Sequence, residues 1–261
     1  MSGGRPILVE PDILDALERA LAARSKDKIG RAAFFDLDGT LIKGHMIADL
    51  PPHLARAGLF GRPELVRIRR LMAGLRSGRV SYRTVAERLP AVYAAGVAGD
   101  EVAAVAAEAA AFAVRRRAAV FPYSRRLVGL MKRSGRLAIA LSGSPLEAVS
   151  ALSGWLGMDA SFGTELEVRE GRYDGRVRHN LIMLETKRRF LDALADALDL
   201  RLEECFGFGD TGQDRAFLDV VGRPVALNPD RRLRAIALNK GWPIFATGQD
   251  IIGKMRKMAG D

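Results

Sequence analysis

Short apolar runs alternate with amphipathic segments along most of this 261-residue chain, and this alternation constrains the fold more than any other feature. Apolar runs of strand length occupy residues 31–35, 136–144, 204–208 and 224–227. Helical spacing of apolar residues occurs at 124–134, 145–157, 185–200 and from about 213. Strands that alternate with helices are typical of parallel sheets covered on both faces. The sequence therefore predicts an α/β fold with a doubly wound parallel sheet.

Two further segments do not follow this alternation. Residues 46–118 are rich in Ala, Leu and Arg at helical spacing, with Gly and Pro as interruptions, which predicts a helical bundle inserted as a cap into the Rossmann-like core. Residues 161–177 alternate with period two around a Glu-Gly pair and predict a β-hairpin. We expect three parts, namely 1–45 with an N-terminal helix at 12–23, the helical cap at 46–118, and the remaining core at 119–261.

Cysteine content and hydropathy indicate where such a chain resides. The single cysteine, Cys205, allows no intrachain disulfide bond, as in most proteins of reducing compartments. The first 20 residues contain acidic residues and prolines where a signal peptide requires an apolar stretch. No uncharged apolar run reaches the roughly 18 residues needed to span a bilayer. We expect a cytoplasmic protein without a membrane span, and the sequence leaves its oligomeric state open.

Polar residues follow several of the predicted strands directly. Asp36 and Asp38 end the first apolar run and are followed by Gly-Thr, and the loops ALSGS and GFGDTGQD end two later runs. Because ligands of doubly wound sheets bind beyond the carboxyl ends of the strands, we expect these loops to meet. They would bring Asp36 and Asp38 together with Ser142, Asp210 and Asp214.

The lysine at the start of the helix predicted at 185–200 adds a positive charge to this set. At 100° per residue, Lys187 lies on the same face as Phe190, Leu191 and Leu194, and this face is expected to point inward. A lysine on an inward face suits a point charge for a phosphate group. The Ser142 hydroxyl and the N–H groups from Gly143 onward, at an expected helix start, can also hold phosphate oxygens.

The carboxylates supply the rest of a phosphoryl-transfer site. A few carboxylate oxygens, completed by phosphate and water, are what Mg²⁺ prefers. A carboxylate nucleophile divides the slow hydrolysis of a phosphate monoester into two steps through an aspartyl-phosphate. A second carboxyl group two residues further can protonate the leaving alkoxide and then deprotonate the attacking water. The residues therefore predict a Mg²⁺ ion and a small phosphorylated substrate.

The stretches DLDGT, SGS and GDTGQD, together with Lys187, resemble the four motifs of the haloacid dehalogenase superfamily of phosphatases. Their order and spacing resemble its phosphoserine phosphatase-like branch, in which a helical cap follows the first motif, and the resemblance spans about residues 30–230. It implies that Asp36 is the nucleophile and Asp38 the general acid and base. It also implies that Ser142 and Lys187 bind the phosphate.

The same resemblance implies a metal site. Asp36, the main-chain carbonyl of Asp38 and Asp210 would hold Mg²⁺, and Asp214 would support them or act as a further ligand. The acid at Asp38 distinguishes the chain from true dehalogenases, which lack one there.

The chain departs from phosphoserine phosphatases near the substrate. Nine residues after the nucleophile, His45 occupies the place of a glutamate that faces the substrate's ammonium group in those enzymes. The motif after Ser142 reads Gly-Ser instead of Gly-Gly. We therefore expect that phosphoserine is not the best substrate.

The predicted cap is strongly basic. Residues 56–88 contain nine arginines against two glutamates, a net charge of +7 in a chain whose net charge is +10. Such a field favours a small anionic organic phosphate or a multiply phosphorylated one, whereas the plainer alternative is a solvated arginine-rich helical face. Two alternative functions stay open: a phosphotransferase using the same aspartyl-phosphate, and a non-catalytic protein that binds nucleic acid or a membrane surface. Few aromatic residues accompany the arginines, so we expect no nucleic-acid partner.

Overall fold

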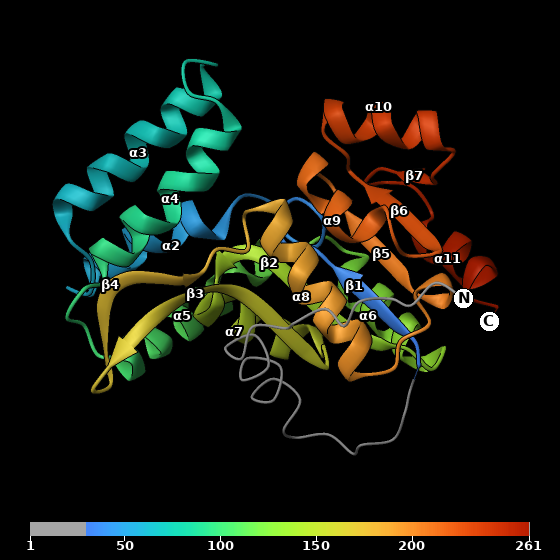
Figure 1. Cartoon of the computed structure of the whole chain (residues 1–261), viewed down its shortest axis with the longest axis horizontal. Coiled ribbons are helices and arrows are strands. Elements are labelled where there is room, and N and C mark those ends of the chain that lie inside the picture. The colour runs from blue at the N-terminus through green and yellow to red at the C-terminus, as the bar shows by residue number, and fades with distance from the viewer. Residues whose placement is uncertain (1–29, 261) are drawn as a thin grey trace, which may run out of the picture.

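The computed structural model describes residues 30–260 and contains a seven-stranded sheet in the order β4-β3-β2-β1-β5-β6-β7 (Figure 1). The strands are β1 Ala32–Phe35, β2 Leu137–Pro145, β3 Ala160–Arg169, β4 Arg172–His179, β5 Phe206–Gly209, β6 Arg223–Leu227 and β7 Ile244–Phe245. Neighbouring strands are parallel except β3 and β4, which form an antiparallel hairpin. The helix predicted at 12–23 lies outside the described residues.

Helices cover both faces of this sheet, as the first strand shows. Ala33 and Phe35 belong to one buried apolar cluster, with side chains of α6, α7 and α11. Ala32 and Phe34 belong to the other, with side chains of α8, α9 and α10. These helices are α6 Ser124–Arg133, α7 Leu146–Leu156, α8 Leu184–Ala197, α9 Arg215–Leu218, α10 Arg231–Lys240 and α11 Ile251–Ala259. The predicted doubly wound α/β fold is confirmed, because successive residues of a strand point to opposite faces.

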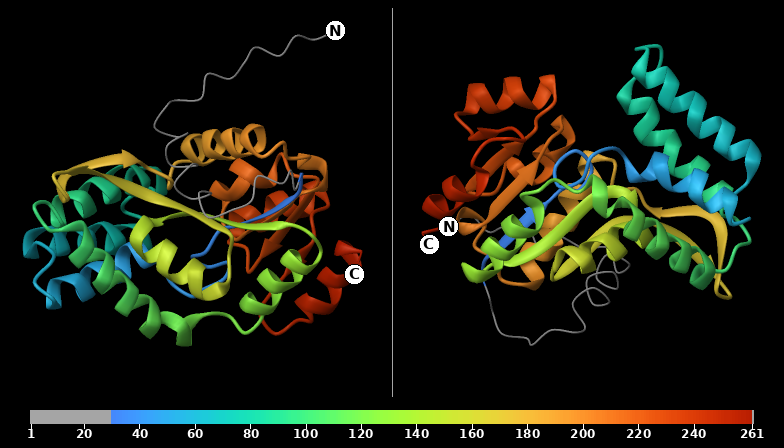
Figure 2. Two further views of the ribbon diagram at one scale, coloured as in Figure 1. Left: turned by 90° about the horizontal axis from the view of Figure 1, so that it is seen from below. Right: turned by 180° about the vertical axis from the view of Figure 1, so that it is seen from behind.

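Four helices are inserted between β1 and the core helix α6, which precedes β2, so the predicted helical insertion is also confirmed. They are α2 Met46–Arg56, α3 Arg62–Arg76, α4 Tyr82–Gly96 and α5 Val102–Arg116, followed by a 3₁₀ turn at Arg117–Ala119. Helices α3 and α4 lie side by side and project beyond the sheet (Figure 2). Within residues 30–260, no helix is long and apolar enough to span a membrane. We propose that the cap comprises residues 46–118.

The hairpin predicted at 161–177 is present as β3 and β4, and it supports the cap. It extends from the edge of the sheet beneath α3 and α4 (Figure 1), and β4 contacts α4. The Asn180 side chain donates a hydrogen bond to Ala86 O in α4 at 2.9 Å. At the hairpin tip, Val102 N–H donates to Gly171 O at 3.0 Å. The hairpin therefore helps to fix where α4 stands over the sheet.

The chain after β2 differs from the sequence-based expectation. Helix α7 begins at Leu146, whereas Gly143 was expected to lie in a first helical turn. Residues 143–145 instead continue β2, because Pro145 pairs with Thr164 of β3 and the Thr164 hydroxyl donates to Gly143 O at 2.8 Å. The segment after Ser142 is therefore extended and tied to β3.

Candidate active site

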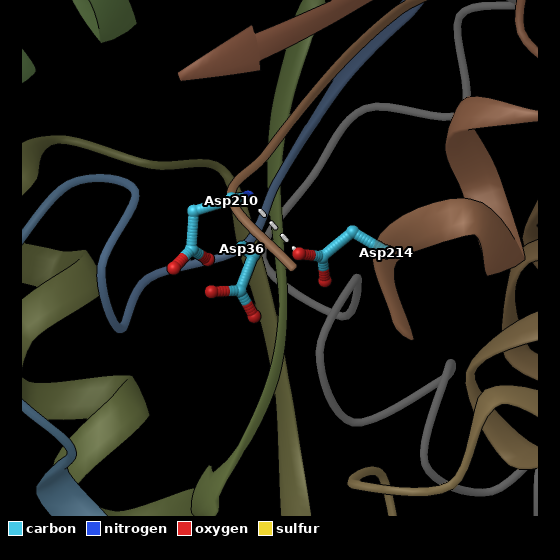
Figure 3. Close-up of side chains that lie close together, drawn as sticks. All are labelled: Asp36, Asp210 and Asp214. Carbon is cyan, nitrogen blue, oxygen red and sulfur yellow. Dashed lines mark hydrogen bonds between the residues drawn. The ribbon is translucent and has the colours of Figure 1, made fainter. Parts of the chain in front are cut away.

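The predicted strand-end loops meet at the carboxyl edge of the sheet. Strands β1 and β5 are parallel neighbours, and Asp36 N–H donates to Phe208 O at 2.9 Å. This pairing places Asp36 next to Asp210, which follows β5. The carboxyl groups of Asp36, Asp210 and Asp214 converge on one small region (Figure 3).

The turn after Asp36 is shaped to accommodate Asp210. The N–H groups of residues 40, 41 and 42 all donate to Leu37 O, which folds the chain back sharply. Gly39 has φ +85°, and a Cβ atom there would lie 2.0 Å from Asp210 Oδ2. The Thr40 hydroxyl donates to Asp210 Oδ1 at 3.1 Å. The Gly-Thr pair therefore gives space to Asp210 and orients it.

Lys187 lies inside this group of carboxylates, on the inward face predicted for its helix. It is 3% exposed, and its Nζ lies 2.9 Å from both Asp36 Oδ1 and Asp214 Oδ1. Burial alone would lower the pKa of Lys187, but the two carboxylates outweigh burial and raise this pKa above its usual range. The lysine therefore carries a positive charge over the whole physiological pH range.

Asp214 uses both of its carboxylate oxygens within the protein. Its Oδ1 accepts from Lys187, and its Oδ2 accepts from Asp210 N–H, Thr211 N–H and the Thr211 hydroxyl at 2.9–3.1 Å. These bonds close the turn that carries Asp210. Asp214 therefore holds the turn and the lysine in place.

The carboxylate cluster has the composition of a metal site. One oxygen each from Asp36, Asp210 and Asp214 lie within 4.8 Å of one another, and all three residues are buried. Burial raises the pKa of both Asp36 and Asp210 well above the ordinary value. When all three are ionised, the carboxylates and the one lysine leave two negative charges, which a divalent cation would balance. The donor set therefore fits a divalent metal ion.

Asp38 faces the start of the cap. Its Oδ1 accepts Met46 N–H at 3.0 Å, and its Oδ2 accepts the Ser144 hydroxyl. Ser144 Oγ in turn accepts Ile47 N–H at 2.9 Å. Burial raises the pKa of Asp38, partly offset by these hydrogen bonds. The sequence reasoning missed Ser144 as a site residue, although the Gly-Ser pair that departs from Gly-Gly was a signal.

The other two loop residues differ in their access to the site. Ser142 is fully buried, and its Oγ accepts Ser144 N–H at 3.2 Å. Gly143 faces the cavity, and a Cβ atom there would lie 2.9 Å from Ile182 Cγ1. Of this pair, Gly143 borders the cavity that contains Asp36, and Ser142 shapes the loop behind it.

A cavity of about 90 Å³ lies above these groups, beneath the cap. Asp36, Asp38 and Lys187 border it, and so does His45, the residue before α2. Tyr82, the first residue of α4, also lines it, and the sequence reasoning assigned no site role to this residue. The nine arginines of 56–88 are all exposed and none borders the cavity, because the amphipathic cap helices turn their charged faces to water.

The sequence model of the haloacid dehalogenase-like hydrolase family matches residues 33–219. This chain belongs to that family. The matched range of this hydrolase includes the cap and every strand-end loop described above, from the Asp36 turn to the Asp214 turn.

Known relatives of this hydrolase include phosphatases at low identity. The phosphoserine phosphatase SerB1 of Mycobacterium tuberculosis is 26% identical over 216 residues, which cover 82% of this chain and 70% of that protein. A protein of unknown function from Bordetella pertussis has a crystal structure with a TM-score of 0.69 and 25% identity, covering 82% and 97% of the two chains. A phosphoserine phosphatase holding a phospho-aspartyl intermediate analogue has a TM-score of 0.59 and 16% identity, over 87% and 97%. This last likeness concerns the fold alone.

Proposed function

We propose that this hydrolase is a Mg²⁺-dependent phosphomonoesterase that acts through an aspartyl-phosphate on a small organic phosphate. The observation that carries the proposal is the position of Asp36. Its Oδ1 is held by Lys187, whereas within residues 30–260 its Oδ2 has no hydrogen-bond partner and the residue borders the cavity. A carboxylate fixed on one side and free on the other suits a nucleophile.

In the proposed reaction Asp36 Oδ2 attacks the phosphorus atom and the alkoxide leaves with a proton from Asp38. The raised pKa of Asp38 favours the protonated form that the first step requires. Asp38 then takes a proton from the water that attacks the phosphorus of the aspartyl-phosphate, which releases inorganic phosphate. Its position between Met46 N–H and the Ser144 hydroxyl fixes the carboxyl group for both transfers.

The remaining residues bind charge. Lys187 and the loop of Ser142 and Gly143 are proposed to hold the phosphate oxygens. Asp36, Asp210 and the Asp38 carbonyl would hold Mg²⁺, with Asp214 fixing their turn. The ion would neutralise the negative charges of the carboxylates and the phosphoryl group.

The direct test is release of phosphate from p-nitrophenyl phosphate by the purified full chain with Mg²⁺. The phosphorylated residue can be trapped by rapid acid quenching and located by peptide mass spectrometry. We expect the trapped phosphoryl group on the peptide that contains Asp36. Turnover with the phosphoryl group trapped on another residue would contradict the proposed nucleophile.

Removing the metal is expected to abolish turnover. In excess chelator we expect activity below about 1% of that with Mg²⁺, because the phosphoryl charge then faces uncompensated carboxylates. Ca²⁺ is expected to restore activity poorly, since it accepts more oxygens at longer distances.

A second measurement examines the metal without catalysis. Mg²⁺ should raise the Tm of the wild-type chain by mass action, and Asp210→Asn should weaken this rise. The exposed Asp196→Asn serves as a matched control. Full turnover in chelator, or no Mg²⁺-dependent rise in Tm, would contradict a Mg²⁺ site.

Ser144 is proposed to position Asp38. Ser144→Ala removes a hydrogen bond to a carboxylate, a contact typically worth about 1.5–3 kcal/mol. We expect kcat/KM for an alkyl phosphate to fall roughly tenfold or more, with a smaller fall for p-nitrophenyl phosphate, which needs less protonation. Ser150→Ala, at an exposed serine of α7, is the control. Equal falls for both substrates would contradict a role through Asp38.

We also propose that phosphoserine, the substrate in the names of several relatives, is not the best substrate here. A buried ammonium group requires a carboxylate partner. Asp49 lies 3.3 Å from Arg116, and Glu87 lies 2.9 Å from Arg83. Neither acid borders the cavity.

A further inference from the structure

The upper wall of the cavity differs chemically from its floor. The floor is polar and consists of the carboxylates, Lys187 and the loops around them. The wall comes from α2, α3, α4 and the segment before α8, and its apolar side chains are Ile47, Met72, Leu75, Val85, Leu89 and Ile182. In the proposed reaction the phosphoryl group occupies the floor, so the wall surrounds the alcohol that leaves.

Charged groups are absent from this wall within residues 30–260. Among the cavity-lining residues, the acids Asp36 and Asp38 and the base Lys187 all lie on the floor. His45 and Tyr82 also line the cavity. The nine arginines of residues 56–88, from which an anionic substrate was expected, are all exposed to solvent.

From this division we propose that the enzyme selects phosphate monoesters whose leaving group is uncharged and apolar, such as a short alkyl group. The inference rests on the proposed phosphatase function and specifies its substrate class. A charged leaving group would lose its hydration against this wall without gaining a partner. An alkyl chain would gain from burial, about fourfold in kcat/KM for each methylene group.

The size of the cavity limits the length of that chain. Its volume of about 90 Å³ is smaller than the roughly 150 Å³ of an apolar cavity that admits benzene. We therefore expect the gain per methylene to stop once the chain fills the space between Met72 and Ile182. A longer chain would have to extend past the wall.

The test compares primary phosphate esters with the full-length enzyme and Mg²⁺. Propyl phosphate and phosphoethanolamine have the same number of heavy atoms and differ in a terminal methyl against an ammonium group. We expect kcat/KM to be at least tenfold higher for propyl phosphate, although the ammonium group makes ethanolamine the better leaving group. Kcat/KM should also rise from ethyl to butyl phosphate, and L-phosphoserine and glycerol 3-phosphate should both fall below propyl phosphate.

A pair of variants at one wall position isolates charge from shape. Met72 is partly buried and lines the cavity. Met72→Gln and Met72→Glu place side chains of similar shape there, the first neutral and the second with a carboxyl group. The quantity compared is kcat/KM for propyl phosphate divided by kcat/KM for phosphoethanolamine. We expect this ratio to be lower in Met72→Glu than in Met72→Gln by about tenfold or more. Arg88→Gln makes the same change in net charge at an exposed cap position and should leave the ratio unchanged.

The outcomes separate the two proposals. Preference for phosphoserine, phosphoethanolamine or glycerol phosphate over propyl phosphate would overturn the apolar leaving group while leaving the phosphatase in place. Equal ratios in the two Met72 variants would also overturn it, since the wall would then not contact the leaving group. If no ester, p-nitrophenyl phosphate included, released phosphate, the proposed function itself would fail, and this inference with it.

Discussion

Replacing Asp36 with asparagine is expected to reduce turnover of p-nitrophenyl phosphate by roughly 10⁴-fold or more, because an amide cannot act as the attacking carboxylate. The fold should survive the change. Asparagine has nearly the same shape, and its amide oxygen can still accept from Lys187. The replacement also removes one buried negative charge from a cluster in which burial already raises the pKa of Asp36. In chelator we therefore expect a Tm equal to or above that of the wild type.

The control for this variant is Asp196→Asn, at an exposed aspartate of α8, which should retain full activity. The rise in Tm with Mg²⁺ should be smaller in Asp36→Asn than in the control, since the proposed metal site loses a charged ligand. Near-normal turnover in folded Asp36→Asn would exclude the covalent mechanism. If Asp36→Asn showed no turnover but a normal rise in Tm with Mg²⁺, Asp36 would still be the nucleophile but would not be a metal ligand.

The sheet and the meeting of the loops were predictable because local patterns determine both. An apolar run that ends in Asp36 can satisfy two carboxylates only at an edge where other polar loops meet. The inward lysine was predictable for a similar reason, since the helical period alone places Lys187 on the face of Phe190 and Leu191. Burial of all three side chains agrees with that prediction.

The start of α7 was not predictable from local signals. The sequence after Ser142 has small residues and a proline, as many helix starts do. The pairing of Pro145 with Thr164, a residue of β3, decides the matter in favour of an extended segment. Such a pairing depends on the register between two strands, which no short motif specifies.

The chemistry of the cavity wall was equally hidden. The arginine count of the cap predicted anionic substrates, yet composition does not tell which face of a helix meets the site. The wall residues Met72 and Val85 come from two helices whose placement depends on the β3–β4 hairpin, through contacts such as the one from Asn180 to Ala86. Substrate preference therefore follows from tertiary packing, whereas the reaction type follows from the motifs.

Replacing Asp38 with asparagine is expected to impair catalysis according to the leaving group. The amide cannot donate a carboxyl proton, and general acid catalysis typically contributes about 10²–10⁴-fold. We expect kcat/KM for propyl phosphate to fall within that range, because its alkoxide is a poor leaving group without a proton. For p-nitrophenyl phosphate, whose phenolate leaves unaided, the fall in kcat/KM should be tenfold or less.

The comparison must use kcat/KM, which reports the steps up to departure of the leaving group. Asp38 is also the proposed base for the second step, which is common to all substrates, so in Asp38→Asn we expect this step to limit kcat. With p-nitrophenyl phosphate, Asp38→Asn should therefore release about one equivalent of nitrophenol in a burst and then turn over slowly. Ser144→Ala retains the Asp38 carboxyl group and should show the same ordering of substrates with smaller losses and no burst. Equal losses in kcat/KM for the two esters would show that Asp38 does not protonate the leaving group, since an acid that acts on the leaving oxygen must matter most where that oxygen is most basic.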